Sequence, residues 1–195
     1  HSYSSAASDV YKRQTLMHEH LLWDIRTPAM QADPDQGPPL CPCTYFDINY
    51  GSVKSPNNLV FSDRKLAVEE VAAMKADGGA AIVELSVGGL KPDPEGLAEI
   101  SEATGVAIVM GCGHYVDEYQ DPANRGRSAD GFAAEMIGQL TDGAWGTTVR
   151  AGIIGEIGCQ SPWTDLEKTV MEGAITAMAE TCLLYTSPSP RDQLQ

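Results

Sequence analysis

The sequence is short of positive charge and of aromatic residues. Its 195 residues include 13 basic and 27 acidic side chains, which gives a net charge of −14, and only 7% are aromatic. Without a cluster of Lys and Arg the chain has no means of displacing counterions, so nucleic acid and anionic membrane surfaces are poor partners. Long apolar runs are also missing: GGAAIV (78–83) and VAIVMGCG (106–113) have the length of strands and are too short to cross a bilayer. The first residues, HSYSSAASDVYKRQ, lack the apolar segment of a secretory signal.

The cysteines are odd in number, and their spacing is not that of a disulfide framework. Cys112 and Cys159 stand in apolar or Gly-rich runs among the five cysteines, which predicts reduced thiols in the core and a cytoplasmic protein. Cys41-Pro42-Cys43 has donors for a soft metal ion, but an isolated C-x-C is more typical of an ordinary loop.

The two ends differ from the middle of the chain. Residues 1–14 and 183–195 have no helical or strand periodicity and are rich in Ser, Tyr and Pro. They are interpreted either as frayed termini or as translated sequence that is not native to the protein. We therefore expect residues 15–182 to form the structured part, whose apolar content is sufficient for a packed core.

Four apolar runs predict strands, and the last three are each followed by a helical pattern. The strands are expected at 15–22, 80–87, 106–113 and 151–158, and the helices at 63–77, 94–104, 128–140 and 166–181. Ser62 is the expected cap of the first helix. The segment 24–62 holds six of the twelve prolines and cannot be one regular element. Alternation of strands and helices predicts an α/β fold with a parallel sheet, and runs that are apolar on both faces indicate buried strands.

Polar residues cluster where these strands end, which is where parallel sheets bind ligands. His18 and His20 are two residues apart, so on a strand both imidazoles point to the same side, about 6.6 Å apart at Cα. Glu156 lies in AGIIGEIG, where an ionised carboxylate is costly unless it is paired or binds a metal. Satisfied core histidines and a salt bridge are the alternatives, but none of the four runs contains a Lys or Arg. We therefore predict a metal site of His18, His20 and Glu156, suited to Zn²⁺, with Mn²⁺ or Co²⁺ as other options.

Four further residues are weaker candidates. Glu84, in a buried strand, either orients a ligand histidine or pairs locally. Asp24 follows the first strand and is a candidate for a similar supporting role. His114 and Tyr115 follow the third strand and are either substrate contacts or an exposed loop pair.

These residues resemble the phosphotriesterase family of the amidohydrolase superfamily. The matches are TLMHEHLL, GLAEISEATGVAIVMGCGHYVD and AGIIGEIG, which follow the family's order over residues 15–182. The resemblance implies a (β/α)₈ TIM barrel of which the first four βα units are present, with a two-metal centre at its carboxyl face. His18 and His20 would bind the more buried ion, and Glu156 would bridge both ions and take part in catalysis. A glutamate in place of the carboxylated lysine of the best-known members is similar to the phosphotriesterase-related branch.

The resemblance implies a hydrolase that acts on a small-molecule ester, namely a phosphotriester, lactone or carboxylic ester, through a metal-activated water. The family takes two more histidines and an aspartate from later strands, so residues 15–182 are expected to be the N-terminal half of the barrel and to be inactive alone. An open half-barrel has unpaired edges, which favours aggregation or a homodimer. Two alternatives remain: a small α/β domain that binds one structural metal without catalysis, and another metal-dependent barrel enzyme such as a lyase.

Overall fold

The computed structural model describes residues 14–33, 35 and 37–183. Residues 1–14 and 183–195, expected to be frayed or non-native ends, lie almost wholly outside the described residues, so that expectation stays a prediction.

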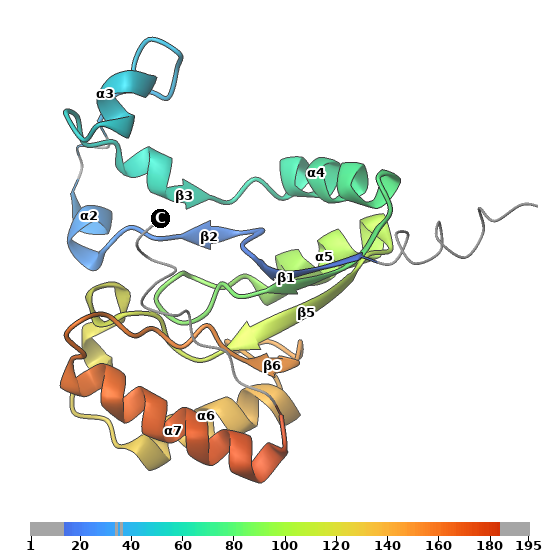
Figure 1. Cartoon of the computed structure of the whole chain (residues 1–195), viewed down its shortest axis with the longest axis vertical. Coiled ribbons are helices and arrows are strands. Elements are labelled where there is room, and N and C mark those ends of the chain that lie inside the picture. Colours follow the sequence, from blue (N-terminus) through green and yellow to red (C-terminus); the bar gives the residue numbers. More distant parts are fainter. Residues whose placement is uncertain (1–13, 34, 36, 184–195) are drawn as a thin grey trace, which may run out of the picture.

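A four-stranded parallel sheet forms the centre of the structure. Its strands are β1 (Gln14–Glu19), β4 (Gly79–Glu84), β5 (Ala107–Cys112) and β6 (Ile153–Ile154), and their spatial order is β1-β4-β5-β6. All three pairings are parallel, and the strands lie side by side with helices on the outside (Figure 1). This arrangement is the curled half of a TIM barrel, which confirms the predicted fold class. β6 is much shorter than the predicted strand at 151–158.

Four helices connect and cover the strands. α5 (Pro94–Thr104) and α7 (Asp165–Thr181) agree closely with the predicted ranges, as do α4 (Arg64–Ala76) and α6 (Ala129–Thr141). Their beginnings are fixed by side chains that accept a backbone N–H of the first turn, among them Asp93, Ser128 and Thr164. The cap of α4 is Asp63 rather than the predicted Ser62, because the Asp63 carboxylate accepts the N–H of Leu66.

The proline-rich segment folds as an arm that projects from the sheet (Figure 1). Its antiparallel strands β2 (Trp23–Asp24) and β3 (Val60–Phe61) flank three short helices. These are α2 (Pro28–Ala32), α3 (Tyr45–Asn49) and the 3₁₀ helix η1 (Pro56–Leu59). Two more 3₁₀ helices, η2 (Asp117–Tyr119) and η3 (Pro122–Asn124), lie between β5 and α6.

One cysteine pair in the arm corrects the sequence analysis. Cys41 and Cys43, expected to be an ordinary loop pair, are joined by a disulfide, so their sulfurs are not available as thiolate ligands for a soft metal. Cys112 and Cys159 are buried, as expected of core thiols.

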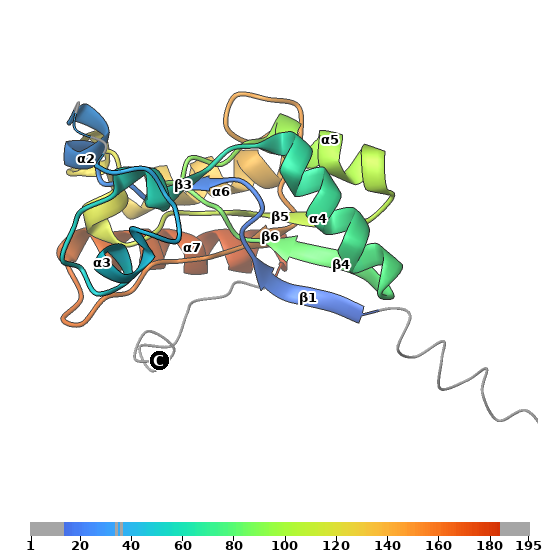
Figure 2. The ribbon, with the colours of Figure 1, turned by 90° about the horizontal axis from the view of Figure 1, so that it is seen from above.

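Two apolar clusters join the sheet to its helices. The larger lies against α6 and α7 and includes Phe132, Met136 and Val170, and the smaller lies against α4 and α5 around Val71 and Ile100. The expectation that every strand is buried on both faces is wrong for β1. Five of its six residues are exposed because it is an edge strand with all labelled helices to one side of it (Figure 2).

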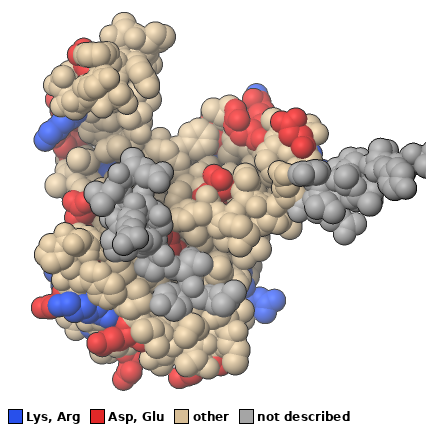
Figure 3. All heavy atoms as spheres, viewed as in Figure 1, with Lys and Arg blue, Asp and Glu red and all other residues tan. Residues whose placement is uncertain are grey.

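Charged side chains are spread over the surface. On the face drawn in Figure 3, Lys and Arg stand in separate places, whereas Asp and Glu form a group near α4 and α5. Within the described residues, no helix has both the length and the apolar character needed to cross a membrane.

Candidate metal centre

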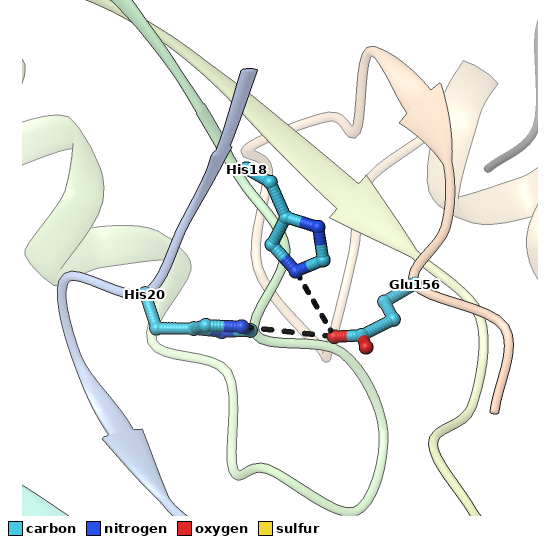
Figure 4. Close-up of side chains that lie close together, drawn as sticks. All are labelled: His18, His20 and Glu156. Atoms are coloured by element: carbon cyan, nitrogen blue, oxygen red, sulfur yellow. Dashed lines mark ion pairs between the residues drawn. The ribbon is translucent and has the colours of Figure 1, made fainter. Parts of the chain in front are cut away.

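The carboxyl ends of the strands bring His18, His20 and Glu156 together. The Nε2 atoms of His18 and His20 lie 3.4 and 3.6 Å from the same Glu156 oxygen, Oε2, and both imidazoles point toward that carboxylate (Figure 4). One ligand atom from each residue fits within 4.8 Å of the others. The three residues predicted from the sequence therefore form one cluster.

Backbone pairing beyond the strands holds this cluster in place. Glu19 stands between the two histidines in the sequence, and its backbone carbonyl accepts the N–H of Leu85 at an N···O distance of 2.9 Å. This hydrogen bond ties the end of β1 to the end of β4. On the other side of the cluster, the N–H groups of Gly155 and Gly158 donate to the carbonyls of Cys112 and His114. Glu156 is thus carried on a segment that runs beside β5 although it lies outside the short strand β6.

Glycine is required for that close approach. A Cβ on Gly158 would lie 2.1 Å from the Val116 nitrogen, and one on Gly111 would lie 2.0 Å from the Gly155 carbonyl oxygen. Neither backbone group can move aside as a flexible side chain can, so these two glycines allow the segment around Glu156 to pack against β5 and its following loop.

Burial sets the charge of the cluster. Desolvation, followed by the electrostatic effect of the neighbouring His18, lowers the pKa of His20 to about 4, so the His20 imidazole is neutral near pH 7. Burial also raises the pKa of Glu156, against the opposing effect of His18. A neutral imidazole is the form that binds a metal ion, and a buried carboxylate gains most from a cation beside it.

The donor set fits a divalent metal ion. Within the described part of the chain, Glu156 pairs with the two imidazoles and with no lysine or arginine. Two nitrogen donors and one carboxylate on a shared side are ligands that Zn²⁺ accepts, and Mn²⁺ and Co²⁺ accept them too.

A second group of polar residues lies directly behind His20. The Ser86 hydroxyl is 3.1 Å from His20 Nδ1, the ring nitrogen that faces away from Glu156. The Glu84 carboxylate accepts the backbone N–H groups of Leu21 at 3.2 Å and Ser86 at 3.3 Å. Burial raises the pKa of Glu84 to about 7, although the hydrogen bonds from Ser86 and Leu21 act in the opposite direction.

Comparison with known proteins identifies the family. The model of the phosphotriesterase family matches residues 7–193. The chain belongs to the phosphotriesterase family. It is 31% identical over 176 residues to a phosphotriesterase-related protein of Nematostella vectensis, covering 86% of this chain and 50% of that protein. It is 35% identical over 174 residues to an N-acetyltaurine hydrolase of Rattus norvegicus, covering 86% of this chain and 49% of that protein.

A solved structure supports the same assignment. The crystal structure of a resiniferatoxin-binding protein from Rhodobacter sphaeroides superposes with a TM-score of 0.81 at 32% identity, and the match covers 93% of this chain and 52% of that one. The chain therefore spans about half the length of the family members it matches.

Tyr115 lies close to the cluster of His18, His20 and Glu156 in this chain. It lines a cavity of about 340 Å³ together with His20, Glu156, Trp23, Ile25 and Leu90. Burial and the negative charge of Glu156 raise the pKa of Tyr115 to about 12, so its hydroxyl keeps its proton near pH 7. A larger cavity, about 600 Å³, lies in the arm and includes none of the three cluster residues.

Asp24 and His114 belong to other contacts. Asp24 pairs with Arg26 and Lys91. Burial acts to raise the pKa of Asp24, but these two cations outweigh it and lower the pKa to about 2. His114 is buried rather than exposed in a loop, and its imidazole lies 3.4 Å from Glu135. It lines a different cavity, of about 410 Å³.

Sequence reasoning missed Ser86 as part of the site. Ser86 is two residues after Glu84 and follows the same strand, so the period of two along a strand could have placed both behind His20. The apolar lining from the arm, Trp23 and Ile25, had no comparable signal, because it depends on how β2 packs against the loop at Leu90.

Proposed function

We propose that this chain supplies the metal-binding N-terminal part of a metal-dependent hydrolase. The observation that carries the proposal is the convergence of His18, His20 and Glu156 on one point at the carboxyl end of the sheet. Membership of the phosphotriesterase family, in which two divalent ions are bound, supports it.

The residues have distinct roles in this proposal. His18 and His20 would hold one divalent ion, and Glu156 would supply the carboxylate ligand of the centre. When bound, the ions lower the pKa of a water molecule and polarise the carbonyl or phosphoryl oxygen of the substrate. Tyr115 and Leu90 shape the adjacent cavity, where a small molecule would lie against the Glu156 side of the cluster.

The substrate proposed first is a small-molecule ester, which includes phosphotriesters, lactones and carboxylic esters. The relatives provide a second candidate, because several proteins that are 31–35% identical to this chain are N-acetyltaurine hydrolases. An N-acyl amide linked to an anionic group is therefore the alternative substrate class, and its hydrolysis needs the same polarised carbonyl.

Metal titration of the 195-residue chain tests the ligand set. We expect Zn²⁺ binding to be lost in His18→Ala, His20→Ala and Glu156→Gln and to be retained in His114→Gln, an imidazole variant outside the cluster. Circular dichroism would confirm that each variant folds. Equal binding by the wild type and the three cluster variants would refute the proposed ligands.

Stoichiometry separates the proposal from a non-catalytic binding domain. A hydrolase site that takes further ligands from another part of the protein should bind Zn²⁺ weakly in this chain, whereas a structural site should hold one ion tightly. Tight binding of a single ion would favour the binding domain.

The substrate class is tested by activity assays on the full-length product of the gene that encodes these residues. Lactones, aryl esters, phosphotriesters and N-acetyltaurine would be compared at equal concentration, with His18→Ala/His20→Ala as the control. If no substrate is turned over faster than by the control variant, the result would contradict a hydrolase of these bond types and would favour the lyase alternative.

A further inference from the structure

His20 is held from two sides, and each of its ring nitrogens has a different neighbour. Nε2 faces the Glu156 carboxylate at 3.6 Å, which is too long for a good hydrogen bond. Nδ1 lies 3.1 Å from the Ser86 hydroxyl, which is within hydrogen-bond distance. The stronger of the two contacts is therefore at the nitrogen that points away from the metal cluster.

Glu84 fixes the groups on both sides of this contact. One of its oxygens accepts the N–H of Leu21, the residue after His20, and the other accepts the N–H of Ser86. The side chain of Glu84 thus connects the end of β1 to the segment that follows β4. Glu84 and Ser86 are 0% and 1% exposed, so bulk water does not compete for these hydrogen bonds.

The hydroxyl of Ser86 can act as the acceptor in its contact with His20. Its oxygen has two lone pairs and one rotatable proton, so it can accept a proton from His20 Nδ1 at 3.1 Å. The Ser86 backbone N–H is donated to Glu84, which holds the hydroxyl at this distance. In a neutral imidazole, a proton on Nδ1 leaves Nε2 without one.

We propose that Glu84 and Ser86 are positioning residues that hold His20 as the tautomer with its proton on Nδ1. This leaves the lone pair of Nε2 directed toward His18 and Glu156, in the form a metal ligand needs before any ion binds. The proposal rests on the proposed function only for the role of Nε2 as a metal ligand. In this role Glu84 and Ser86 act through His20 and do not contact the substrate.

The tautomer is measured directly by ¹⁵N NMR of the metal-free 195-residue chain at pH 7.5. The His20 signals are assigned by their loss in His20→Ala. We expect the wild type to show the proton on Nδ1 and Ser86→Ala to shift the population toward Nε2–H. Ser101→Ala is the matched control, because the Ser101 hydroxyl makes a partly buried hydrogen bond, to the Val106 carbonyl at 2.8 Å, away from the cluster. A wild type with its proton on Nε2, or a Ser86→Ala variant without change, would overturn the proposal.

Metal affinity provides a second readout. We expect Ser86→Ala and Glu84→Gln to weaken Zn²⁺ binding about 10- to 100-fold, the range seen when partners of metal-ligating histidines are removed. Ser86→Thr keeps the hydroxyl and should restore most of the affinity. Unchanged affinity in Ser86→Ala would contradict a positioning role.

The two readouts keep the proposals separate. A wild-type chain that has the Nδ1–H tautomer but binds no Zn²⁺ would count against the metal site and support the role of Glu84 and Ser86. A chain that binds Zn²⁺ through His20 with no tautomer preference in the metal-free state would support the metal site alone and overturn the positioning role.

Discussion

Three glutamates are buried among the residues that the structure describes, and each has different partners. Glu167 accepts backbone N–H groups from Asp117, Gln160 and Thr164, and Glu84 accepts two. Within the described residues Glu156 has only the imidazoles of His18 and His20 as partners. A buried carboxylate without N–H donors or a permanent cation is costly, so the compensation that Glu156 lacks is what a metal ion would provide.

The raised pKa of Glu84 has a consequence for stability. Burial raises this pKa from 4.5 to about 7, so the folded chain holds a proton that the unfolded chain has lost between these two values. The protonated Glu84 carboxyl therefore contributes about 3 kcal/mol to the free energy of unfolding. This contribution is fully present below pH 4.5 and is lost as the pH rises through 7. In Glu84→Gln this loss should be absent.

Urea unfolding between pH 5 and pH 8 measures the effect. The free energy of unfolding of Glu84→Gln minus that of the wild type should increase as the pH rises, because only the wild type loses stability over this range. His20 has a lowered pKa and gives a slope of opposite sign, but it is present in both proteins and cancels. A difference that is the same at every pH would show that Glu84 titrates normally.

At the scale of elements, the segment around Glu156 is positioned by close backbone packing rather than by a long strand. β6 has two residues, and the residues after it run beside the loop that follows β5. Gly158 permits this, because any side chain there would meet the backbone of Tyr115 and Val116. The position of Glu156 therefore depends on a glycine two residues away from it.

Gly158→Ala should destabilise the chain by about 2–3 kcal/mol, since the added methyl group meets backbone atoms that cannot yield. Gly138→Ala is the matched control: Gly138 lies within α6 and a Cβ there meets nothing within 4 Å. It should stabilise the chain by about 0.5–1 kcal/mol through helix propensity. Thermal unfolding of both variants compares them, and a loss of stability in Gly158→Ala no larger than in Gly138→Ala would disprove the packing argument.

The sequence predicted the regular elements and the proximity of His18, His20 and Glu156 because both depend on local patterns. Capping residues and apolar periodicity located α5 and α7, and the spacing of His18 and His20 placed two imidazoles on one side. Features that depend on tertiary contacts were not predictable in the same way. The burial of His114 beside Glu135 and the pairing of Asp24 with Lys91 join segments that are far apart in the sequence. The exposure of β1 depends on what covers the sheet.

At the scale of the whole molecule, the sheet has two edges. β1 and β6 each have one neighbouring strand, and β1 also exposes apolar side chains, with Met17 at 65% and Leu16 at 38% exposure. An exposed edge strand with apolar side chains is a template for association with another chain.

We expect the 195-residue chain to self-associate through this edge. Met17→Lys should reduce the associated fraction in sedimentation velocity, because a charged side chain on an edge strand opposes pairing. Ile175→Lys is the control, since Ile175 is also exposed but lies on α7. A wild type that sediments as a monomer at all concentrations would refute the expectation.

The chain alone should not catalyse hydrolysis. It spans about half the length of its relatives, and within the part that the structure describes the cluster consists of His18, His20 and Glu156. The purified chain, supplied with Zn²⁺, should turn over aryl esters, lactones and phosphotriesters no faster than its His18→Ala/His20→Ala variant. A rate clearly above that control would show that the three ligands suffice.

The strands are unequally buried along their length. In β4 and β5 the first three residues are exposed or half-buried, whereas the last three, 82–84 and 110–112, are fully buried. Amide protons at the carboxyl ends should therefore exchange with solvent slowest, and those at the amino ends fastest. The cluster of His18, His20 and Glu156 lies beside this slowly opening part of the sheet, but its residues come from the edge strand β1, the turn after it and the segment after β6. Fraying of either edge would therefore separate the three side chains while the ends of β4 and β5 stay closed.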